Sequence, residues 1–221
     1  MGLKFNSTSQ KYLMRIKLAI FDGEGVIYNS KKVIKVFKKE YDLFLRKFGV
    51  SFKEQEKLWF KFYPKALKGK LTLKETDEIV YKKLGIPKSK VKEWLRKDKQ
   101  INLKFVKLNK DAKKILLETK AKGIKVAILS NTVHPLKWRL ELYKKLKLVK
   151  GKHYDKLFLS NRIGYKKPEK EAYLTVLKYF KVKPKEAVFV GHDKKELEGA
   201  RKVGMRALTL SQYKRFLWRI N

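Results

Sequence analysis

The chain contains no cysteine among its 221 residues. Structural disulfides and cysteine-based metal sites are therefore excluded, and an intracellular, cytoplasmic setting is expected. Long hydrophobic runs are also missing, because no apolar stretch approaches the roughly 20 residues that cross a bilayer. The N-terminal segment is too polar for a signal peptide. The sequence therefore predicts a protein without a membrane partner.

Acidic residues are scarce relative to basic ones. The chain has 58 Lys and Arg against 21 Asp and Glu, a net charge of +37. Such an excess is typical of proteins that bind a polyanion, so nucleic acid or the ribosome is kept as a candidate partner. A compositional bias toward lysine is the competing interpretation. Thermophile surfaces usually pair Lys with Glu, and here Glu does not keep pace.

Hydrophobic residues make up 43% of the chain, which is typical of a globular protein. Five short apolar segments alternate with helical patterns along it. They are residues 15–21 and the stretches IKVAILSNT, YDKLFLSN, AVFVGHD and RALTL. Strands that alternate with helices predict a doubly wound parallel sheet, an α/β fold of the Rossmann-like kind.

The hydrophobic pattern changes from residue 31 to residue 100, where no strand pattern occurs. Two capping boxes mark helix starts there, one with Ser51 and Glu54 and one with Thr72 and Glu75. The block is predicted to form about four amphipathic helices, packed as a bundle.

The predicted domain boundaries follow from this change of hydrophobic pattern. Residues 1–14 form an N-terminal extension, residues 15–30 and 101–221 form the α/β core, and residues 31–100 form an inserted helical domain. The oligomeric state is not predicted.

The last eleven residues, SQYKRFLWRIN, mix Tyr213, Phe216 and Trp218 with basic side chains. A helix that packs on the core is the favoured interpretation. The alternative is a contact that stacks on RNA bases and neutralises phosphates.

Polar residues gather where the predicted strands end. Asp22 follows the first strand, Ser130 and Asn131 follow the second, and the turn GYKKP and the loop GHDKKE follow the next two. In open α/β sheets, functional groups collect at the carboxyl ends of strands. Each group alone is weak evidence, since an Asp that precedes Gly belongs to an ordinary turn about as often as it has a functional role. Their joint occurrence favours one active site.

The residue types suit phosphoryl transfer. The Asp22 carboxylate can attack phosphorus and form an aspartyl-phosphate, and Glu24 can protonate the leaving oxygen and then activate water. Ser130 or Asn131 can donate a hydrogen bond to a phosphoryl oxygen, and a Lys of the KKP turn can neutralise developing charge.

A hard divalent cation would complete such a site. Mg²⁺ prefers oxygen ligands and would bridge the phosphate to carboxylates. Asp193 is the expected second carboxylate beside Asp22, and Glu196 lies one helical turn further on.

Four motifs together resemble the haloacid dehalogenase superfamily, in which Mg²⁺-dependent phosphatases predominate. The motifs are FDGEGVI, ILSNT, GYKKPEKEAY and FVGHDKKELEGARKVGM. The resemblance covers residues 15–30 and 111–210, and the helical block between the first two motifs resembles the family's helical cap.

This resemblance implies specific roles. Asp22 would be the nucleophile and Glu24 the acid and base. Ser130 and Lys167, which directly precedes Pro, would bind phosphate. Mg²⁺ would be held by Asp22, the backbone carbonyl of Glu24 and Asp193, with Glu196 as a supporting acid.

The sequence departs from the family pattern at two positions. Glu24 stands where the phosphatases have Asp, which moves its carboxylate about 1.5 Å outward. His192 falls where the family has the acid of its Gly-Asp pair. Because His is a poor Mg²⁺ ligand, Asp193 is the preferred ligand and His192 is interpreted as a bystander.

The sequence thus predicts a Mg²⁺-dependent phosphomonoester hydrolase that acts on a small phosphorylated substrate through Asp22. The main alternative is a basic RNA- or ribosome-binding protein with weak or no catalysis on the same fold. A dehalogenase is less favoured, because the second acid position is not normally acidic in that branch.

Overall fold

The computed structural model describes residues 16–219. Its centre is a five-stranded sheet in the order β5-β4-β1-β6-β7, in which every neighbouring pair is parallel. The strands are β1 (Leu18–Asp22), β4 (Lys125–Ser130), β5 (Lys156–Leu159), β6 (Ala187–Val190) and β7 (Arg206–Leu208). The predicted doubly wound α/β fold is confirmed. The predicted extension at residues 1–14 lies outside the described residues.

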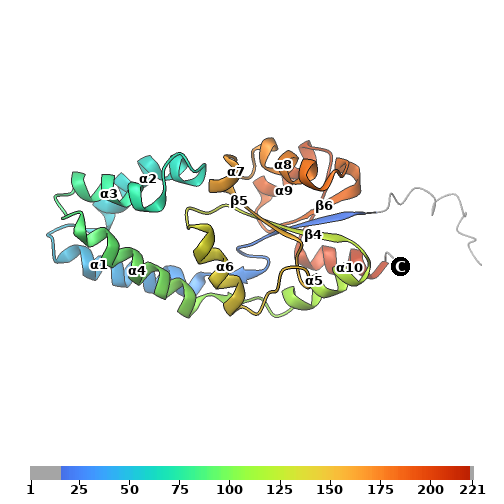
Figure 1. Ribbon diagram of the computed structural model, residues 1–221, viewed down its shortest axis with the longest axis horizontal. Coiled ribbons are helices and arrows are strands. Elements are labelled where there is room, and N and C mark those ends of the chain that lie inside the picture. The colour runs from blue at the N-terminus through green and yellow to red at the C-terminus, as the bar shows by residue number, and fades with distance from the viewer. Residues whose placement is uncertain (1–15, 220–221) are drawn as a thin grey trace, which may run out of the picture.

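Helices cover both faces of this sheet (Figure 1). One face carries α5 (Ala112–Ala121), α6 (Leu136–Lys145) and α10 (Leu210–Arg219), and the other carries α8 (Lys170–Phe180) and α9 (Lys194–Lys202). Along β1, Ala19 and Phe21 pack into the first core, whereas Leu18 and Ile20 pack into the second. A strand buried on both faces explains why β1 reads as a continuous apolar run.

The C-terminal helix α10 packs on the sheet. Tyr213 is fully buried and meets Phe21 edge to face, with ring centroids 5.3 Å apart. Its hydroxyl lies 3.1 Å from the hydroxyl of Thr119. The core-packing interpretation of this segment is therefore confirmed, and Tyr213 cannot stack on a nucleic-acid base.

Four helices form a separate unit at one end of the molecule (Figure 1). They are α1 (Lys31–Arg46), α2 (Phe52–Leu67), α3 (Leu73–Lys83) and α4 (Ser89–Phe105). Both predicted capping boxes form, at the starts of α2 and α3. Tyr41 and Trp94 stack at the centre of the unit, with ring centroids 4.0 Å apart.

Two short strands join this unit to the sheet domain. β2 (Tyr28–Asn29) and β3 (Lys107–Leu108) pair antiparallel, and the Asn109 side chain donates to the carbonyl of Val26 at 2.8 Å. Strands of two residues leave no pattern in a sequence, so this pair was not predicted. The predicted limit at residue 100 falls inside α4, and the division into core and inserted domain stays a prediction.

The helical unit also touches the core at two other places. The end of α2 lies on α7 (Ser160–Ile163), and Lys68 forms an ion pair with Glu169 at 2.7 Å. On the opposite side α4 contacts α6, where Lys99 pairs with Glu141 at 2.6 Å. These contacts hold the unit over the carboxyl ends of the strands.

A single-turn 3₁₀ helix at Pro184–Glu186 precedes β6.

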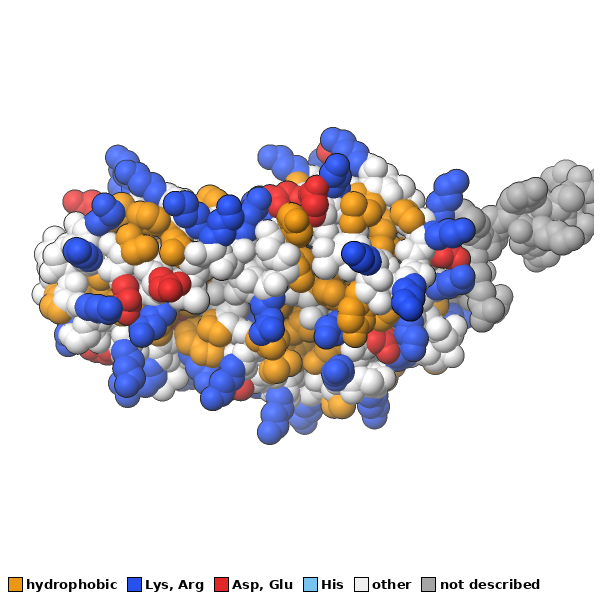
Figure 2. Space-filling view, turned by 45° about the horizontal axis from the view of Figure 1, so that its top comes forward, with side chains coloured by type: hydrophobic (Ala, Val, Ile, Leu, Met, Phe, Trp, Pro, Cys, Tyr) orange, Lys and Arg blue, Asp and Glu red, His pale blue; other side chains and the backbone are white. Residues whose placement is uncertain are grey.

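Basic side chains are spread widely over the surface. Figure 2 shows Lys and Arg across both ends of the visible face, interspersed with hydrophobic and acidic side chains and not gathered into one stripe. Within residues 16–219, no helix is both long enough and apolar enough to span a membrane.

Candidate active site

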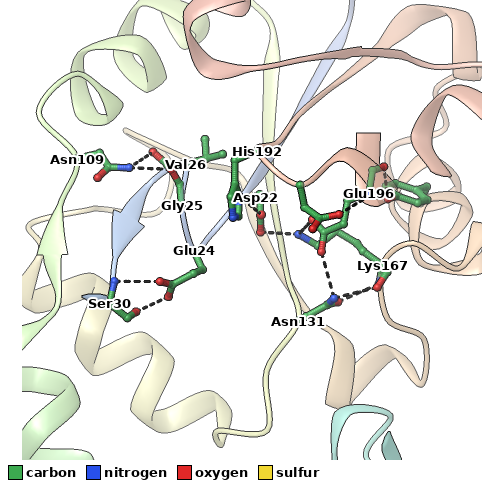
Figure 3. Close-up of polar contacts among 12 residues, drawn as sticks. Asp22, Glu24, Gly25, Val26, Ser30, Asn109, Asn131, Lys167, His192 and Glu196 are labelled. Atoms are coloured by element: carbon green, nitrogen blue, oxygen red, sulfur yellow. Dashed lines mark hydrogen bonds and ion pairs between the residues drawn. The ribbon is translucent and has the colours of Figure 1, made fainter. Parts of the chain in front are cut away.

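Asp22 ends β1 at the centre of the sheet and is only 4% exposed. Its oxygen Oδ1 contacts the ammonium group of Lys167, and its oxygen Oδ2 lies 3.2 Å from Nδ1 of His192. Figure 3 shows the three side chains converging at the strand end. Each oxygen of the carboxylate therefore faces a basic side chain.

These contacts decide the protonation state of Asp22. Burial disfavours the ionised form, but the charge of Lys167 and the hydrogen bonds from His192 and Lys167 outweigh it. The pKa of Asp22 is held below its ordinary value. An ionised carboxylate at this position is the form that a nucleophile needs.

Lys167 is held in place by two acids and by Asn131. Its ammonium group contacts Asp22 and lies 2.8 Å from Oε2 of Glu196. Burial opposes its charge, but the two carboxylates raise its pKa above the ordinary value. The Asn131 side chain donates to the carbonyl of Lys167 at 3.0 Å and accepts from its N–H at 2.9 Å. Asn131 thus positions the lysine.

Asp193 begins α9 and caps it. Its carboxylate accepts the backbone N–H of Glu196 at 3.0 Å, and the residue is exposed. The first N–H groups of a helix have no partner within the helix, so an acid at this position is drawn to them. Glu196 itself is turned toward Lys167, and burial raises its pKa.

His192 lies directly against Asp22. Its ring packs over Gly25, where an added Cβ would come within 2.4 Å of it and where the backbone φ is +79°. The hydrogen bond to Asp22 raises the pKa of His192 above its ordinary value. The interpretation of His192 as a bystander is corrected: its ring, and not the Asp193 carboxylate, contacts Asp22, because Asp193 is engaged in capping α9.

The Glu24 carboxylate faces away from Asp22 (Figure 3). Its Oε1 accepts the backbone N–H of Ser30 at 2.9 Å, and its Oε2 accepts the Ser30 hydroxyl. Ser30 precedes α1, so Glu24 satisfies a donor at the start of that helix. In this conformation Glu24 anchors the beginning of the helical unit.

Ser130 ends β4 beside Asp22. The register pairs Asp22 with Leu129, which places Ser130 next to the loop that follows β1. An added Cβ at Gly23 would lie 2.9 Å from the Ser130 hydroxyl, so the two are in close contact. The structure thus brings Asp22, Ser130 and Lys167 together, as the sequence predicted.

The predicted metal ligands do not converge. Glu24 is bound to Ser30, Asp193 caps α9, and Lys167 lies between Asp22 and Glu196. In the part of the chain that the structure describes, no group of three or more His, Cys, Asp or Glu side chains could hold a metal ion. The set of Asp22, Glu24, Asp193 and Glu196 as metal ligands therefore stays a prediction.

A buried arginine that the sequence gave no sign of lies near the site. Arg139, on α6, donates to the hydroxyls of Thr132 and Tyr28 at 2.7 and 3.1 Å, and to Nδ1 of His134 at 2.9 Å. The other ring nitrogen of His134 lies 3.3 Å from the Asp98 carboxylate on α4. This chain of contacts connects the core to the helical unit.

A cavity of about 520 Å³ opens beside the site, between the helical unit and the core. Glu24 and Ser30 form part of its wall on the Asp22 side, and Val133, His134 and Arg139 line it from the core. Asp22, Ser130 and Lys167 are not among its lining residues.

The comparisons with known proteins agree on one family. A family model described as "Haloacid dehalogenase-like hydrolase" matches residues 19–210. A curated relative, the glyceraldehyde 3-phosphate phosphatase of Pyrococcus furiosus, is 33% identical over 111 residues, which is 48% of this chain and 44% of that protein. The match thus spans less than half of the relative's length.

Solved structures share the fold. A haloacid dehalogenase family enzyme of Bacteroides thetaiotaomicron, solved as a magnesium complex, has a TM-score of 0.67 at 20% identity, over 92% of this chain and 98% of that one. The L-2-haloacid dehalogenase of Xanthobacter autotrophicus, with chloropropionic acid covalently bound, has a TM-score of 0.62 at 20% identity, over 88% and 77%. At these identities the likeness concerns the fold alone.

Proposed function

Because this chain belongs to the haloacid dehalogenase-like hydrolases, we propose that it hydrolyses phosphomonoesters with Asp22 as the nucleophile. The observation that carries the proposal is the environment of Asp22. This buried carboxylate at the central strand end has a pKa held below its ordinary value, and Lys167 and His192 flank it. The helical unit α1–α4 would serve as the cap that encloses the substrate.

The first step forms an aspartyl-phosphate. An oxygen of Asp22 bonds to phosphorus while the bond from phosphorus to the alcohol oxygen breaks, and the alcohol takes a proton from Glu24. Lys167 and the Ser130 hydroxyl would bind the phosphoryl oxygens, where they offset the charge that develops during transfer.

The second step releases phosphate. A water molecule gives its proton to Glu24 and bonds to phosphorus, and the bond from phosphorus to Asp22 breaks. The Asp22 carboxylate and the protonated Glu24 are regenerated together with inorganic phosphate. Asn131 acts through Lys167, whose backbone it holds on both sides.

Glu24 can act only after its carboxylate leaves Ser30. We expect Glu24→Gln to lower kcat roughly 10²-fold or more for an alkyl phosphate, whose alcohol must be protonated as it leaves. For p-nitrophenyl phosphate the loss in kcat/KM, which reports the first step, should be much smaller, because p-nitrophenolate leaves without a proton; kcat should fall for both esters, since Glu24 also activates the water of the second step. Steady-state kinetics on the two esters measure this difference.

Ser30→Ala is the matched control for Glu24. It removes a hydrogen bond to the carboxylate and keeps the acid, so kcat should be maintained for both esters. If Ser30→Ala and Glu24→Gln reduced kcat equally, Glu24 would be only an anchor of α1, and its acid and base role would be wrong.

In this conformation the side chains do not form a Mg²⁺ site. The oxygen Oδ2 of Asp22 is in contact with His192, and the Asp193 carboxylate caps α9. The backbone carbonyl of Glu24, which is the ligand expected from that residue, is independent of the contact between its carboxylate and Ser30. No step above is therefore assigned to the metal, and the predicted dependence on Mg²⁺ requires measurement.

His192→Asp is expected to create a Mg²⁺ site. The substitution removes a basic ring from Asp22 and adds a second carboxylate beside it, which suits a hard cation. At 100 times the dissociation constant, Mg²⁺ should stabilise the variant by about 2.7 kcal/mol. This corresponds to a rise in Tm of roughly 5–11 °C for a chain of this size. Thermal unfolding with Mg²⁺ or with EDTA measures it.

The wild type and Asp193→Asn serve as controls in this experiment. Neither should respond to Mg²⁺ by more than the experimental scatter, since Asp193 acts as a helix cap. An equal Mg²⁺ response in the wild type, lost in Asp193→Asn, would show that Asp193 reorients to bind the metal.

The proposed function is tested with p-nitrophenyl phosphate and a panel of phosphorylated metabolites, each with Mg²⁺ and with EDTA. Glyceraldehyde 3-phosphate belongs in the panel because the Pyrococcus relative is named for it. Absence of hydrolysis of every ester by purified wild-type protein would refute the proposal.

RNA or ribosome binding gains no support from the geometry. Lys and Arg are spread over the visible face (Figure 2), and Tyr213 is buried. The matching family model is described as a hydrolase and the Pyrococcus relative is named a phosphatase. RNA binding measured at increasing salt tests this alternative, because phosphate-driven binding weakens steeply with salt.

A further inference from the structure

The cavity beside Asp22 is walled by aromatic rings. Seven of its lining side chains are aromatic. Tyr41 and Trp94 are fully buried and stacked on each other within the bundle, whereas Phe37, Trp59 and Tyr63 are only half-buried. Trp59 and Tyr63 lie side by side, with ring centroids 4.8 Å apart. The half-buried rings leave aromatic surface for a ligand.

The cavity reverses the charge balance of the protein. Its lining includes the four acids Glu24, Glu56, Asp77 and Asp98, against two side chains of the Lys and Arg type. The whole chain has 58 Lys and Arg against 21 acids. Of the two cations, Arg139 is occupied by Thr132, Tyr28 and His134. The cavity is therefore a locally acidic site in a basic protein.

Asp77 is a buried acid of the cavity that forms no ion pair with a described residue. It lies on α3 and is 4% exposed. Its Oδ1 accepts the indole N–H of Trp59 at 3.0 Å, and Oδ2 receives no hydrogen bond from any described residue. Burial, only partly offset by Trp59, raises the pKa of Asp77 to about 8. Asp77 is therefore largely protonated at neutral pH and ionised above about pH 8, and because the ionised form has no cation, a cationic ligand would favour that form and be bound by it.

Asp98, the other buried acid of the cavity, differs in this respect. Its Oδ1 accepts from Asn102 at 2.8 Å, and its Oδ2 lies 3.3 Å from His134. Both oxygens of Asp98 thus have a partner within the protein, whereas Asp77 has one oxygen without a hydrogen bond from the described residues.

We propose that this cavity binds the cationic nitrogen of the substrate, so that the ester cleaved at Asp22 is the phosphate of an amino alcohol or a quaternary ammonium alcohol. Aromatic faces attract ammonium groups through their quadrupole, and the Asp77 carboxylate supplies the opposite charge. The phosphate end lies with Lys167 and Ser130, and the cationic end lies with Trp59 and Asp77. The substrate class rests on the proposed phosphatase function, whereas binding of the cation does not.

The test is a comparison of choline with 3,3-dimethylbutanol, which has the same shape and no charge. Quenching of tryptophan fluorescence reports binding, since Trp59 and Trp94 line the cavity. Choline should bind at least about tenfold more tightly than 3,3-dimethylbutanol. Equal affinity, or no binding of choline, would overturn the proposal.

Variants locate the site. At a pH of about 9, above the pKa of Asp77, Asp77→Asn should weaken choline binding roughly tenfold and leave 3,3-dimethylbutanol unchanged, because the substitution removes the charge and keeps the shape. Asp42→Asn is the matched control: it is the same substitution on the partly exposed Asp42 of α1, which pairs with Arg46 and does not line the cavity. Tyr63→Leu removes aromatic surface without touching an acid and should also reduce the preference for choline. A preference unchanged in both Asp77→Asn and Tyr63→Leu would contradict the assignment.

Turnover separates this inference from the proposed function. The kcat/KM for phosphocholine should exceed that for 3,3-dimethylbutyl phosphate by about the same factor as the binding ratio. Equal hydrolysis of the two esters would refute the substrate class and leave the phosphatase intact. Selective choline binding without hydrolysis of either ester or of p-nitrophenyl phosphate would support the cation site and refute the phosphatase.

Discussion

Replacing Asp22 with asparagine is expected to reduce kcat/KM for phosphomonoesters by at least about 10⁴-fold, as loss of a covalent nucleophile does in other hydrolases. The side-chain amide of the variant has the shape of the carboxylate, but it is uncharged and too weak a nucleophile to attack phosphorus. Purified Asp22→Asn protein, assayed beside the wild type on p-nitrophenyl phosphate, gives the ratio. The residual rate also measures any contaminating phosphatase.

The fold should survive this substitution. Lys167 keeps its second partner, Glu196, at 2.8 Å, so Tm should change little and inorganic phosphate should still bind. Asp193→Asn is the matched control, because it makes the same change three residues from Glu196 at an exposed helix cap. Its activity should stay within a few-fold of the wild type. Equal losses in both variants would mean that Asp22 has no special role.

The same protein tests the dehalogenase alternative. Halide release from 2-chloropropionate requires Asp22 to attack carbon and not phosphorus. We expect no halide release by the wild type. Release that depends on Asp22, without phosphatase activity, would move the chain to the dehalogenase branch of the family.

Replacing Lys167 with methionine is expected to abolish activity and to lower stability by about 3–5 kcal/mol, the usual cost of breaking a buried ion pair on one side. Asp22 and Glu196 would then be buried beside each other, with His192 as the remaining basic contact of Asp22 and no cation beside Glu196. For a chain of this size the Tm should fall by roughly 6–20 °C at neutral pH. Thermal unfolding monitored by circular dichroism measures the loss.

The deficit of Lys167→Met should shrink as the pH falls. Without the lysine, burial and mutual repulsion raise the pKa values of Asp22 and Glu196 above their unfolded values. Acids with raised pKa values favour the folded state at low pH and disfavour it as the pH rises through the folded pKa. The gap to the wild type should therefore be largest at neutral pH and smallest toward about pH 4.

A triple variant provides the control for this argument. Adding Asp22→Asn and Glu196→Gln to Lys167→Met removes both stranded charges, so most of the lost stability should return while activity stays absent. A triple variant as unstable as Lys167→Met alone would indicate that the lysine contributes by packing and not by charge.

The main elements of the fold could be predicted because their signals are local. β1 reads as an apolar run that stops at Asp22, and the starts of α2 and α3 carry capping boxes whose residues satisfy the first N–H groups of the helix. The strand ends then bring Asp22, Ser130 and Lys167 together, since parallel strands place their carboxyl ends at one edge.

The directions of the loop side chains could not be predicted in the same way. The carboxylates of Glu24 and Asp193 each accept a hydrogen bond from a backbone N–H group at the start of a helix. These hydrogen bonds direct both side chains away from Asp22. His192 reaches Asp22 because Gly25 leaves space for its ring. These outcomes depend on contacts between separate segments, which a motif pattern does not contain.

The residues of the cavity escaped prediction for a related reason. Asp77 sits in an ordinary amphipathic helix, and only the packing of α2 against α3 places the Trp59 indole on it. Arg139 likewise lies in a basic helix whose sequence gives no sign that this one guanidinium is buried.

The most direct test of the account is chemical trapping of the intermediate on Asp22. Wild-type protein turning over an alkyl phosphate is quenched in acid and reduced with borohydride, which converts an aspartyl-phosphate to homoserine. Trypsin then releases residues 18–31, and tandem mass spectrometry reads position 22. The account predicts homoserine at this position during turnover, and unmodified aspartate in protein without substrate. Continued hydrolysis with aspartate unmodified at position 22, or homoserine at another acid, would contradict it.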